Sequence, residues 1–496
     1  AAIEAVLVAK RVPEKQREAV MAAATEKLAQ RLRDGQAPKV KVYDKAAPSQ
    51  RPVVVPMPEV QRTRERAAPA RGRRPDVVGS AAGHSAYLVG GRRFEAGSPG
   101  FAEAIAAAHS AHERPRCLCL VGGIEMYVAR LASASDGYIV KRMPDTGSHH
   151  APDCPSYEPP PEVSGLGQVL GAAITEDPTT GETTLKLDFP MSKIPGRSTT
   201  PAAGGESSSV ASSGAKLSLR GLLHYLWDQA ELTHWQPGFA GKRTWGTVRS
   251  HLLQAAENKI ARGNSLRARL FIPEVFTVDQ RDAINARRMS QWSQAVAVPG
   301  KPQHLMLLIA EVKEIVPARY GFKAVVKHVP DQALALDEQT YRRLGRRFER
   351  GLTLWGASDD IHMVMIATFS VAAAGIPTIV ELSLMPVTRQ WLPVEDGFEK
   401  QLVERLVADA RSFVKGLRYN LDAGSALASA TLTDCEGSPT SLVVAPAGVA
   451  DNGRCLQVCD PSIPVWLWYP SSEAMPTLPP RRHRRPSMVE TAGGIG

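Results

Sequence analysis

The stretches RCLC, residues 116–119, and SHHAPDC, residues 148–154, hold three of the chain's six cysteines and two adjacent histidines. Three thiolates and one imidazole are a soft donor set of the kind that structural zinc prefers. We therefore predict a zinc site made by Cys117, Cys119 and Cys154 with His150, and His149 is the spare histidine. The sequence leaves the choice between the two histidines open. Four protein ligands fill a tetrahedral metal completely, which is typical of a structural site.

The residues between the two stretches predict how they meet. GIEMYVARLA (123–132) and GYIVKRMP (137–144) have the composition of two strands, and SASDG between them is a turn. This hairpin returns the chain, and Pro152 then forces a second turn. Alternate residues of a strand share a face, so we expect Cys117 and Cys119 to project from one face of a strand. In the alternative interpretation the cysteines are small buried hydrophobic residues and the histidines lie on an exposed loop.

Composition limits the classes of protein to consider. A chain of 496 residues with 43% hydrophobic residues can bury a sizeable core, and its length predicts two to four domains. The net charge of +10 favours polyanionic partners, among which nucleic acid is the commonest. Six cysteines are too few for a secreted disulfide scaffold, and the opening residues AAIEAVLVAKRVPEK do not resemble a signal peptide. We therefore expect a cytoplasmic protein.

The order of predicted elements indicates a multi-domain α+β fold, in which a zinc-held β-hairpin module precedes a helical segment and mostly antiparallel sheets with helices. Helices are expected over 217–235, 244–263, 338–355 and 398–417. The expected segments are a largely disordered N-terminal helix and basic linker (1–95), the zinc-binding β-hairpin module (96–160), a β-hairpin extension (161–200), a flexible linker (201–216), a helical and winged-helix-like segment (217–300), two α+β regions (301–390 and 391–470) and a disordered basic tail (471–496).

One uncharged run, MVMIATFSVAAAGIPTIV (363–380), is long enough to be tested as a membrane span. Its β-branched residues favour strands, and polar residues, Gly375 and Pro377 interrupt it. The AAG in its middle is a natural turn. We therefore predict two buried strands and no membrane partner.

Two groups of basic residues are candidates for contact with nucleic-acid phosphates. The helix over 338–355 gathers four arginines opposite an apolar stripe that runs from Tyr341 to Trp355: Arg343, Arg346, Arg347 and Arg350. A solvated surface paired with local carboxylates explains this group equally well.

The second group belongs to two helices joined by QPGFAGKR (236–243), which have the order of a helix-turn-helix or winged-helix unit. Its phosphate ligands would be Lys242, Arg243, Arg249 and Lys259. The turn is longer than in the compact motif, and Trp227, Trp235 and Trp245 are expected in the core.

A metal-dependent nuclease is the alternative to a binding protein. Glu311 and Lys313 are expected on one face of a strand, as half of such a site, but no aspartate stands on an obvious neighbouring strand. Glu399 and Asp434 resemble a second nuclease pattern, whose later strand reads Val443, Val444 and Ala445 where an acid and a lysine are needed. We expect a degenerate, non-cutting version at most. No phosphate loop and no serine hydrolase elbow occurs in the sequence.

The chain also resembles domain-of-unknown-function family 1173. The resemblance covers roughly residues 81–470 and is carried by RCLC, GIEMYVARL, YIVKRMPDTGSHHAPDC, TTLKLDFPMSKIPGR, LSLRGLLHYLWDQAELTHW, RLFIPEVF, LIAEVKEI and FVKGLRYNL. Three cysteines mark the family, and Cys117, Cys119 and Cys154 match them. The resemblance implies a bacterial protein of an integrative and conjugative element, with protein partners from that element, and it brings no established activity.

These observations lead to one main hypothesis about function. We expect a cytoplasmic, non-enzymatic protein of a mobile element that binds nucleic acid or a DNA-processing complex and holds a structural zinc. A nuclease-derived domain and a protein-interaction module are the alternatives. Cys435, Cys455 and Cys459 are expected to be free thiols, because no histidine lies near them.

Overall fold

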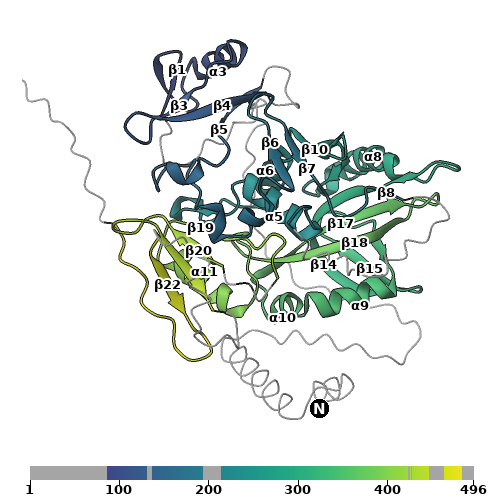
Figure 1. Ribbon diagram of the computed structural model, residues 1–496. Helices are drawn as coiled ribbons and strands as arrows, with labels where there is room; N and C mark the ends of the chain where they lie inside the picture. The colour runs from purple at the N-terminus through teal and green to yellow at the C-terminus, as the bar shows by residue number, and fades with distance from the viewer. Residues whose placement is uncertain are drawn as a thin grey trace, which may run out of the picture. The chain divides into compact units, whose positions relative to one another are not determined.

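The computed structural model describes residues 86–130, 137–193, 214–422, 425, 427–445 and 463–482 (Figure 1). All of them belong to one compact unit, Val77–Gly496. Several predictions lie outside the described residues: the N-terminal helix, most of the basic linker, most of the linker over 201–216, the end of the tail, and Cys455 and Cys459.

The Cys/His module is a five-stranded antiparallel sheet with one helix. Its spatial order is β2 (Arg92–Glu95), β1 (Ala86–Val89), β3 (Arg116–Cys117), β4 (Ile124–Arg130) and β5 (Tyr138–Arg142). Helix α3 (Phe101–Ser110) buries Ile105 and Ala108 in the core of the module. The predicted hairpin is confirmed, since β4 and β5 pair antiparallel from Met126–Arg142 to Arg130–Tyr138.

The N-terminal boundary predicted for this module is wrong. Strands β1 and β2 fall within the segment that was assigned to the linker, and the module therefore begins by residue 86 instead of residue 96. The turn between them uses Gly90 and Gly91, whose φ angles of 56° and 72° favour glycine. Four-residue strands around such a turn are too short to show a clear alternation of apolar residues.

Short elements connect the module to the rest of the unit. They include α4 (Leu166–Val169), and the predicted hairpin of β6 (Ile174–Glu176) and β7 (Thr183–Leu185) is present. Strand β7 pairs in parallel with β10 (Lys259–Ala261), which also pairs with β11 (Asn264–Ser265). Strand β8 (Ser192–Lys193) pairs with β13 (Gln303–His304).

The helical segment contains α5 (Leu219–Gln229), α6 (Trp245–Ala255), α7 (Leu266–Arg269) and α8 (Arg281–Trp292). The side chains of Ser218 and Thr244 cap the first turns of α5 and α6. Trp227, Trp235 and Trp245 are buried, as expected. The helix predicted over 244–263 is too long, because α6 ends at Ala255 and the chain turns at Asn258, with a φ of 56°, into β10.

Five strands close into a β-barrel. Around the barrel the order is β14 (Met306–Pro317), β15 (Phe322–Val326), β16 (Leu334–Leu336), β18 (Pro377–Thr388) and β17 (Ile361–Val371), which pairs again with β14. All pairs are antiparallel except β16 with β18. A bulge between Val312 and Glu314 bends strand β14 between the part that pairs with β17 and the part that pairs with β15. A short strand, β12 (Leu270–Phe271), lies in parallel beside β14.

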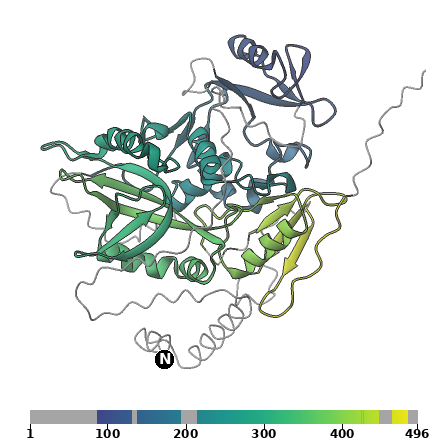
Figure 2. The same ribbon diagram turned by 180° about the vertical axis from the view of Figure 1, so that it is seen from behind.

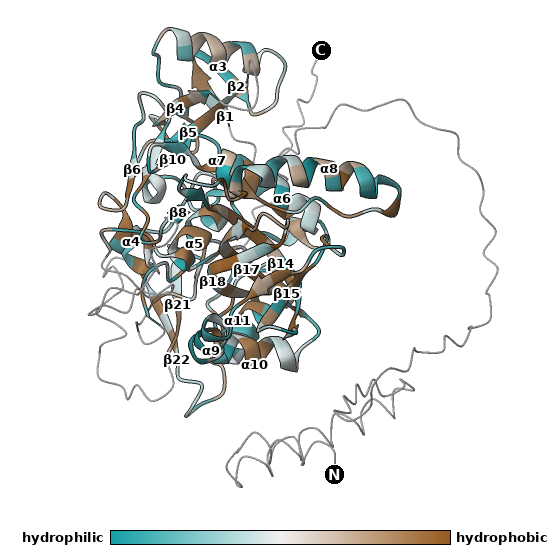
Figure 3. Ribbon diagram, turned by 90° about the vertical axis from the view of Figure 1, so that its right-hand side faces the viewer, coloured by the Kyte–Doolittle hydropathy of each residue, from teal (hydrophilic) through white to brown (hydrophobic). Residues whose placement is uncertain are grey.

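Three barrel strands, β14, β17 and β18, are buried on both faces. Met365 and Ala367 of β17 face the barrel interior, whereas Val364 and Ile366 pack in the core that contains α5 and α6. The same alternation holds for β14, and Figure 3 shows the hydrophobic colouring of these strands. This double burial explains the uncharged run over 363–380, whose residues form a hairpin as predicted. Among the described residues, no helix is both long and apolar enough to cross a membrane.

Two helices stand where one was predicted over 338–355. Helix α9 (Glu338–Arg347) and helix α10 (Glu349–Ala357) are separated at Phe348, whose backbone is not helical. Leu344 is buried in the barrel core, and Tyr341, Phe348, Leu352 and Trp355 pack against that core, so the predicted apolar stripe is confirmed.

The C-terminal sheet has the order β22 (Val465–Trp468), β21 (Thr440–Val444), β20 (Ala430–Leu432), β19 (Phe413–Lys415) and β9 (His234–Trp235). Helix α11 (Gly397–Ala408) packs Leu402 and Leu406 into the core of this sheet, and Figure 2 shows the helix against the strands from behind. The helix predicted over 398–417 is therefore too long. Ala410, with a φ of 53°, redirects the chain from α11 toward β19.

We predict that Phe369→Ala destabilises the barrel strongly. The ring is fully buried and packs edge-on against Trp292 at a centroid distance of 5.3 Å. Removing a buried phenylalanine ring costs about 3–5 kcal/mol of unfolding free energy, measurable by urea denaturation. Ile376→Ala is the control, because this side chain is 50% exposed and its loss should change the free energy by less than about 0.5 kcal/mol. Equal losses in both variants would contradict the assignment of the core.

Candidate metal centre

The four ligand candidates come from the end of β3 with the turn after it, and from the loop after β5. Cys117 is the last residue of β3, and it pairs with Tyr87 on one side and Ile124 on the other. Cys119 lies beyond the strand, in the turn that leads to β4. The prediction that both cysteines project from one face of a strand is therefore wrong. The turn, rather than strand alternation, brings the second thiol to the first.

Two glycines shape this turn. Gly122 and Gly123 have φ angles of 88° and 68°, and the Gly123 amide donates a hydrogen bond to Leu120 O at 3.1 Å. A Cβ atom on Gly123 would lie 3.1 Å from Cβ of Arg116. The sequence CLCLVGG therefore encodes a tight cysteine-bearing turn, and the two glycines are the signal that the strand interpretation missed.

The second loop presents His150 and Cys154. A 3-10 turn over Gly147–His149 ends at His150, and the Cys154 amide then donates to Ala151 O at 2.8 Å. His150 is 2% exposed, whereas His149 is exposed to solvent. The structure thus selects His150 and leaves His149 outside the cluster.

The donor atoms are spaced as a tetrahedral metal requires. The sulfurs of Cys117 and Cys154 lie 3.7 Å apart, and Nδ1 of His150 lies 3.4 Å from the Cys119 sulfur and 3.7 Å from the Cys154 sulfur. All four donor atoms lie within 4.8 Å of one another. A tetrahedral zinc with ordinary bond lengths needs about 3.8 Å between two sulfurs and about 3.5 Å between sulfur and nitrogen. The four residues can therefore hold a metal ion.

Without a metal the cluster disfavours the thiolate forms of Cys119 and Cys154. A hydrogen bond from Cys154 lowers the pKa of Cys117, whereas the same contact and burial raise the pKa of Cys154 to about 12. Burial raises the pKa of Cys119. The Ser156 amide points at the Cys154 sulfur from 3.4 Å, as an amide does toward a thiolate ligand. A divalent cation at the centre favours deprotonation of all three thiols.

The fold and the site define an α+β protein that contains a Cys3His cluster in its N-terminal module and, later in the chain, a closed β-barrel. The chain belongs to the family described as protein of unknown function (DUF1173), whose model matches residues 87–471 and so includes all four cluster residues. No curated protein and no solved structure matches the chain.

The basic residues predicted around α6 have different surroundings. Lys242 is exposed. Arg243 donates to Leu232 O at 2.8 Å and stands over the rings of Trp235 and Phe239. Burial lowers its pKa to about 10. Arg249 lines a pocket beside β12.

Lys259 cannot contact a phosphate as predicted. Its side chain is 1% exposed and donates to Thr183 Oγ1 at 3.0 Å, over the ring of Tyr225. The parallel pairing of β10 with β7 places this lysine in the interior.

The predicted arginines of 338–355 divide between two helices. Arg343 and Arg347 of α9 are half-buried, whereas Arg346 of α9 and Arg350 of α10 are exposed. The break at Phe348 means that the four do not lie along one helix face.

The first carboxylate considered for a nuclease site, Glu311, is bound by basic side chains of the protein itself. Glu311 is 4% exposed and binds His362 Nδ1 at 2.6 Å and Lys327, whereas Lys313 lies at the bulge and is exposed. The two residues therefore do not share a face as predicted. Among the described residues, the Cys/His cluster is the one group of three or more potential metal ligands.

Glu399 and Asp434, the carboxylates of the second nuclease pattern, also form ion pairs with basic side chains of the protein. Glu399 accepts from Lys415 Nζ at 2.8 Å, and Asp434 accepts from Arg411 at 2.8 Å and from the Ser412 amide at 2.9 Å. Both carboxylates stabilise the C-terminal sheet and are not directed at a common metal. Cys435 is a buried free thiol, as expected.

We predict that His150→Ala loses a bound metal that His149→Ala keeps. Only the His150 ring faces the three sulfurs, so its removal opens the tetrahedron, whereas His149 is exposed. The measurement is the metal content of protein purified without chelator, by plasma mass spectrometry. Retention by His150→Ala together with loss from His149→Ala would contradict this assignment.

We also predict a pH-dependent cost for Glu311→Gln. Burial raises the pKa of Glu311, but the hydrogen bonds from His362 and Lys327 outweigh it and lower the pKa below its usual range. Such a carboxylate stabilises the fold above its unfolded pKa of about 4.3, and the stabilisation is lost as the pH falls through the folded pKa. At pH 7 the variant should lose about 1–3 kcal/mol of unfolding free energy. The gap to wild type should narrow toward pH 3, and a constant gap would refute the assignment.

Proposed function

We propose that Cys117, Cys119, His150 and Cys154 hold a structural zinc ion. The observation that carries the proposal is the separation of the donor atoms, 3.4–3.7 Å for the three closest contacts. Three sulfurs and an imidazole favour zinc over magnesium, calcium or manganese, which prefer oxygen ligands. The protein fills all four positions, so the ion has no open site for a substrate.

The module needs such an ion because little else fixes its ligand loops. Strand β3 is two residues long, and Cys119, His150 and Cys154 all lie outside regular strands and α-helices. The core around the cluster is small, and Cys117 and Cys154 are themselves part of it. In a small domain of this kind, the binding energy of a structural zinc contributes directly to folding.

We further propose that the barrel binds single-stranded nucleic acid. Around the barrel the strands follow the order β14, β15, β16, β18, β17 and β14 again, which is 1-2-3-5-4-1 when the five strands are numbered along the chain. Helices α9 and α10 come between the third strand, β16, and the fourth, β17. This arrangement is that of the oligonucleotide- and oligosaccharide-binding fold, whose ligands lie across the second and third strands and the adjoining loops. A shared fold alone does not assign a function, so the surface chemistry must support it.

That surface has the residues that a nucleic-acid strand needs. Strands β14, β17 and β18 are covered by the core around α5 and α6, whereas strand β15 exposes Lys323. The turn before it carries Tyr320, which is 82% exposed, with the Arg319 guanidinium 5.4 Å above its ring. Exposed aromatic rings stack on bases, and the cations bind the backbone. The net charge of +10 adds long-range attraction.

The setting of this activity is also a proposal. The resemblance to family 1173 supports a bacterial protein of an integrative and conjugative element, acting in the cytoplasm on nucleic acid or in a DNA-processing complex. The engagement of Glu311, Glu399 and Asp434 by internal cations supports binding without cleavage.

We predict that Tyr320→Ala weakens binding of a fluorescent 20-nucleotide single-stranded DNA, measured by anisotropy with the full chain. Loss of one stacking ring costs about 1–3 kcal/mol, or about 5- to 160-fold in affinity. Tyr320→Phe keeps the ring and should bind like the wild type. No binding by the wild type, or equal binding by Tyr320→Ala, would reject the proposed surface and favour a protein-interaction module.

A further inference from the structure

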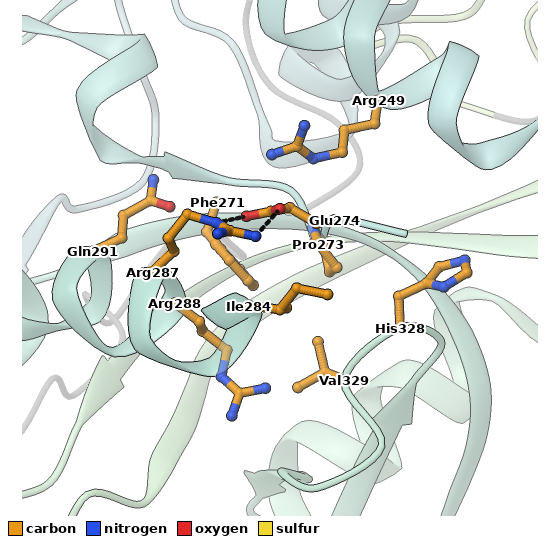
Figure 4. A pocket seen from close by; sticks show the side chains of 10 residues that line it. All are labelled: Arg249, Phe271, Pro273, Glu274, Ile284, Arg287, Arg288, Gln291, His328 and Val329. Atoms are coloured by element: carbon orange, nitrogen blue, oxygen red, sulfur yellow. Dashed lines mark hydrogen bonds and ion pairs between the residues drawn. The ribbon is translucent and has the colours of Figure 1, made fainter. Parts of the chain in front are cut away.

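A pocket beside the barrel is lined by basic side chains from three separate elements. Arg249 comes from α6, Arg287 from α8 and His328 from the loop between β15 and β16. Ile284 and Val329 form an apolar part of its wall. Figure 4 shows Glu274 between the side chains of Arg249 and Arg287.

The hydrogen bonds leave donors available in this pocket. Arg287 donates twice to the Glu274 carboxylate, at 2.9 and 2.8 Å, in a pair that is partly exposed to solvent. Arg249 donates its Nε proton to Ile272 O at 3.0 Å, and no hydrogen bond of its two terminal nitrogens occurs among the described residues. Arg288 is different, because Asp331 and Asn285 bind it and it points away from Glu274 in Figure 4.

The charges of the pocket are not balanced. Burial lowers the pKa of Arg249, Glu274 raises it, and the nearby charges of Arg267 and Arg287 lower it again. The charges of Arg267 and Arg287 thus both act on the Arg249 guanidinium. Arg267 has a partner of its own, Glu257, at 3.6 Å. Arg249 and Arg287 therefore share a single internal anion.

His328 adds a further polar group. Its Nδ1 accepts the Phe276 amide proton at 3.2 Å, so the ring keeps its proton on Nε2 when neutral. The ring stacks on Trp245 with an interplanar angle of 17°, and the residue has a φ of 67°, which is unusual for a side chain of this size. Packing holds this strained residue in place at the edge of the pocket.

We propose that this pocket binds one backbone phosphate of a single-stranded nucleic acid, with Arg249 and Arg287 as its ligands and with Glu274 as the internal anion that the phosphate displaces. Arginine guanidinium groups bind phosphate oxygens through paired hydrogen bonds. The ion pair between Arg287 and Glu274 is partly exposed, so a phosphate that binds both Arg249 and Arg287 can reach it and replace the carboxylate. The proposal rests on nucleic-acid binding by the barrel and adds a phosphate site to it.

The position of the pocket along the barrel fits this assignment. Tyr320 precedes β15 and His328 follows it, so the two lie toward opposite ends of the five-residue strand. Five residues of strand span about 17 Å. A few nucleotides cover that length, which is within the range bound by one barrel of this kind. A strand that stacks on Tyr320 can therefore reach the arginines with a later phosphate.

The test compares the salt dependence of DNA binding by the full chain in four variants. In Arg249→Gln/Arg287→Gln we expect affinity to fall about 10- to 100-fold and the slope of log affinity against log salt to flatten by about 0.7, the value of one phosphate contact. Arg249→Lys/Arg287→Lys keeps the charges and should keep the slope. Glu274→Gln removes the competing anion and should bind about 2- to 5-fold tighter. Arg405→Gln is the control, since it removes an arginine paired with Asp409 on α11.

Each outcome has a separate meaning. No binding by the wild type would overturn nucleic-acid binding itself, and the phosphate site with it. Wild-type binding with unchanged slopes in the glutamine variants would overturn only the phosphate site. Saturable binding of inorganic phosphate without binding of the oligonucleotide would reassign the pocket to a small anion and overturn the proposal. Thermal melting of each variant separates loss of binding from loss of folding.

Discussion

The convergence of three sulfurs and one imidazole nitrogen is the constraint on which the N-terminal Cys/His module depends. It joins the end of β3 to the loop after β5, and that loop continues directly into contacts with the rest of the unit. The Tyr157 amide donates to Cys154 O, and Tyr157 O lies 3.0 Å from Nε2 of His234. A metal held by the cluster would therefore fix both the module and the chain that leaves it.

The barrel is stabilised differently, by strands that are buried on both faces. Strand β14 contributes alternately to the barrel interior and to the core with α5 and α6, so one strand stabilises two cores. Covering those strands leaves the β15 and β16 side available. The distribution of hydrophobic residues thus decides which barrel surface stays exposed.

Sequence patterns predicted the parts of the structure that depend on composition and local periodicity. The ligand types, the β4–β5 hairpin and the double strand over 363–380 are of this kind. Patterns failed where one residue redirects the backbone: at Asn258, Phe348 and Ala410, and in the Gly122–Gly123 turn. They also could not separate Arg243 from Arg249. Terminal nitrogens of Arg243 donate to carbonyl oxygens, whereas those of Arg249 make no hydrogen bond within the described part of the chain, and that difference arises only from tertiary contacts.

The most direct test of the metal centre is X-ray absorption spectroscopy at the zinc edge on protein purified without chelator. The cluster predicts about three sulfur neighbours near 2.3 Å and one nitrogen near 2.0–2.1 Å. A first shell of nitrogen and oxygen only, or protein that contains no zinc, would contradict the account and return Cys117, Cys119 and Cys154 to the role of buried thiols.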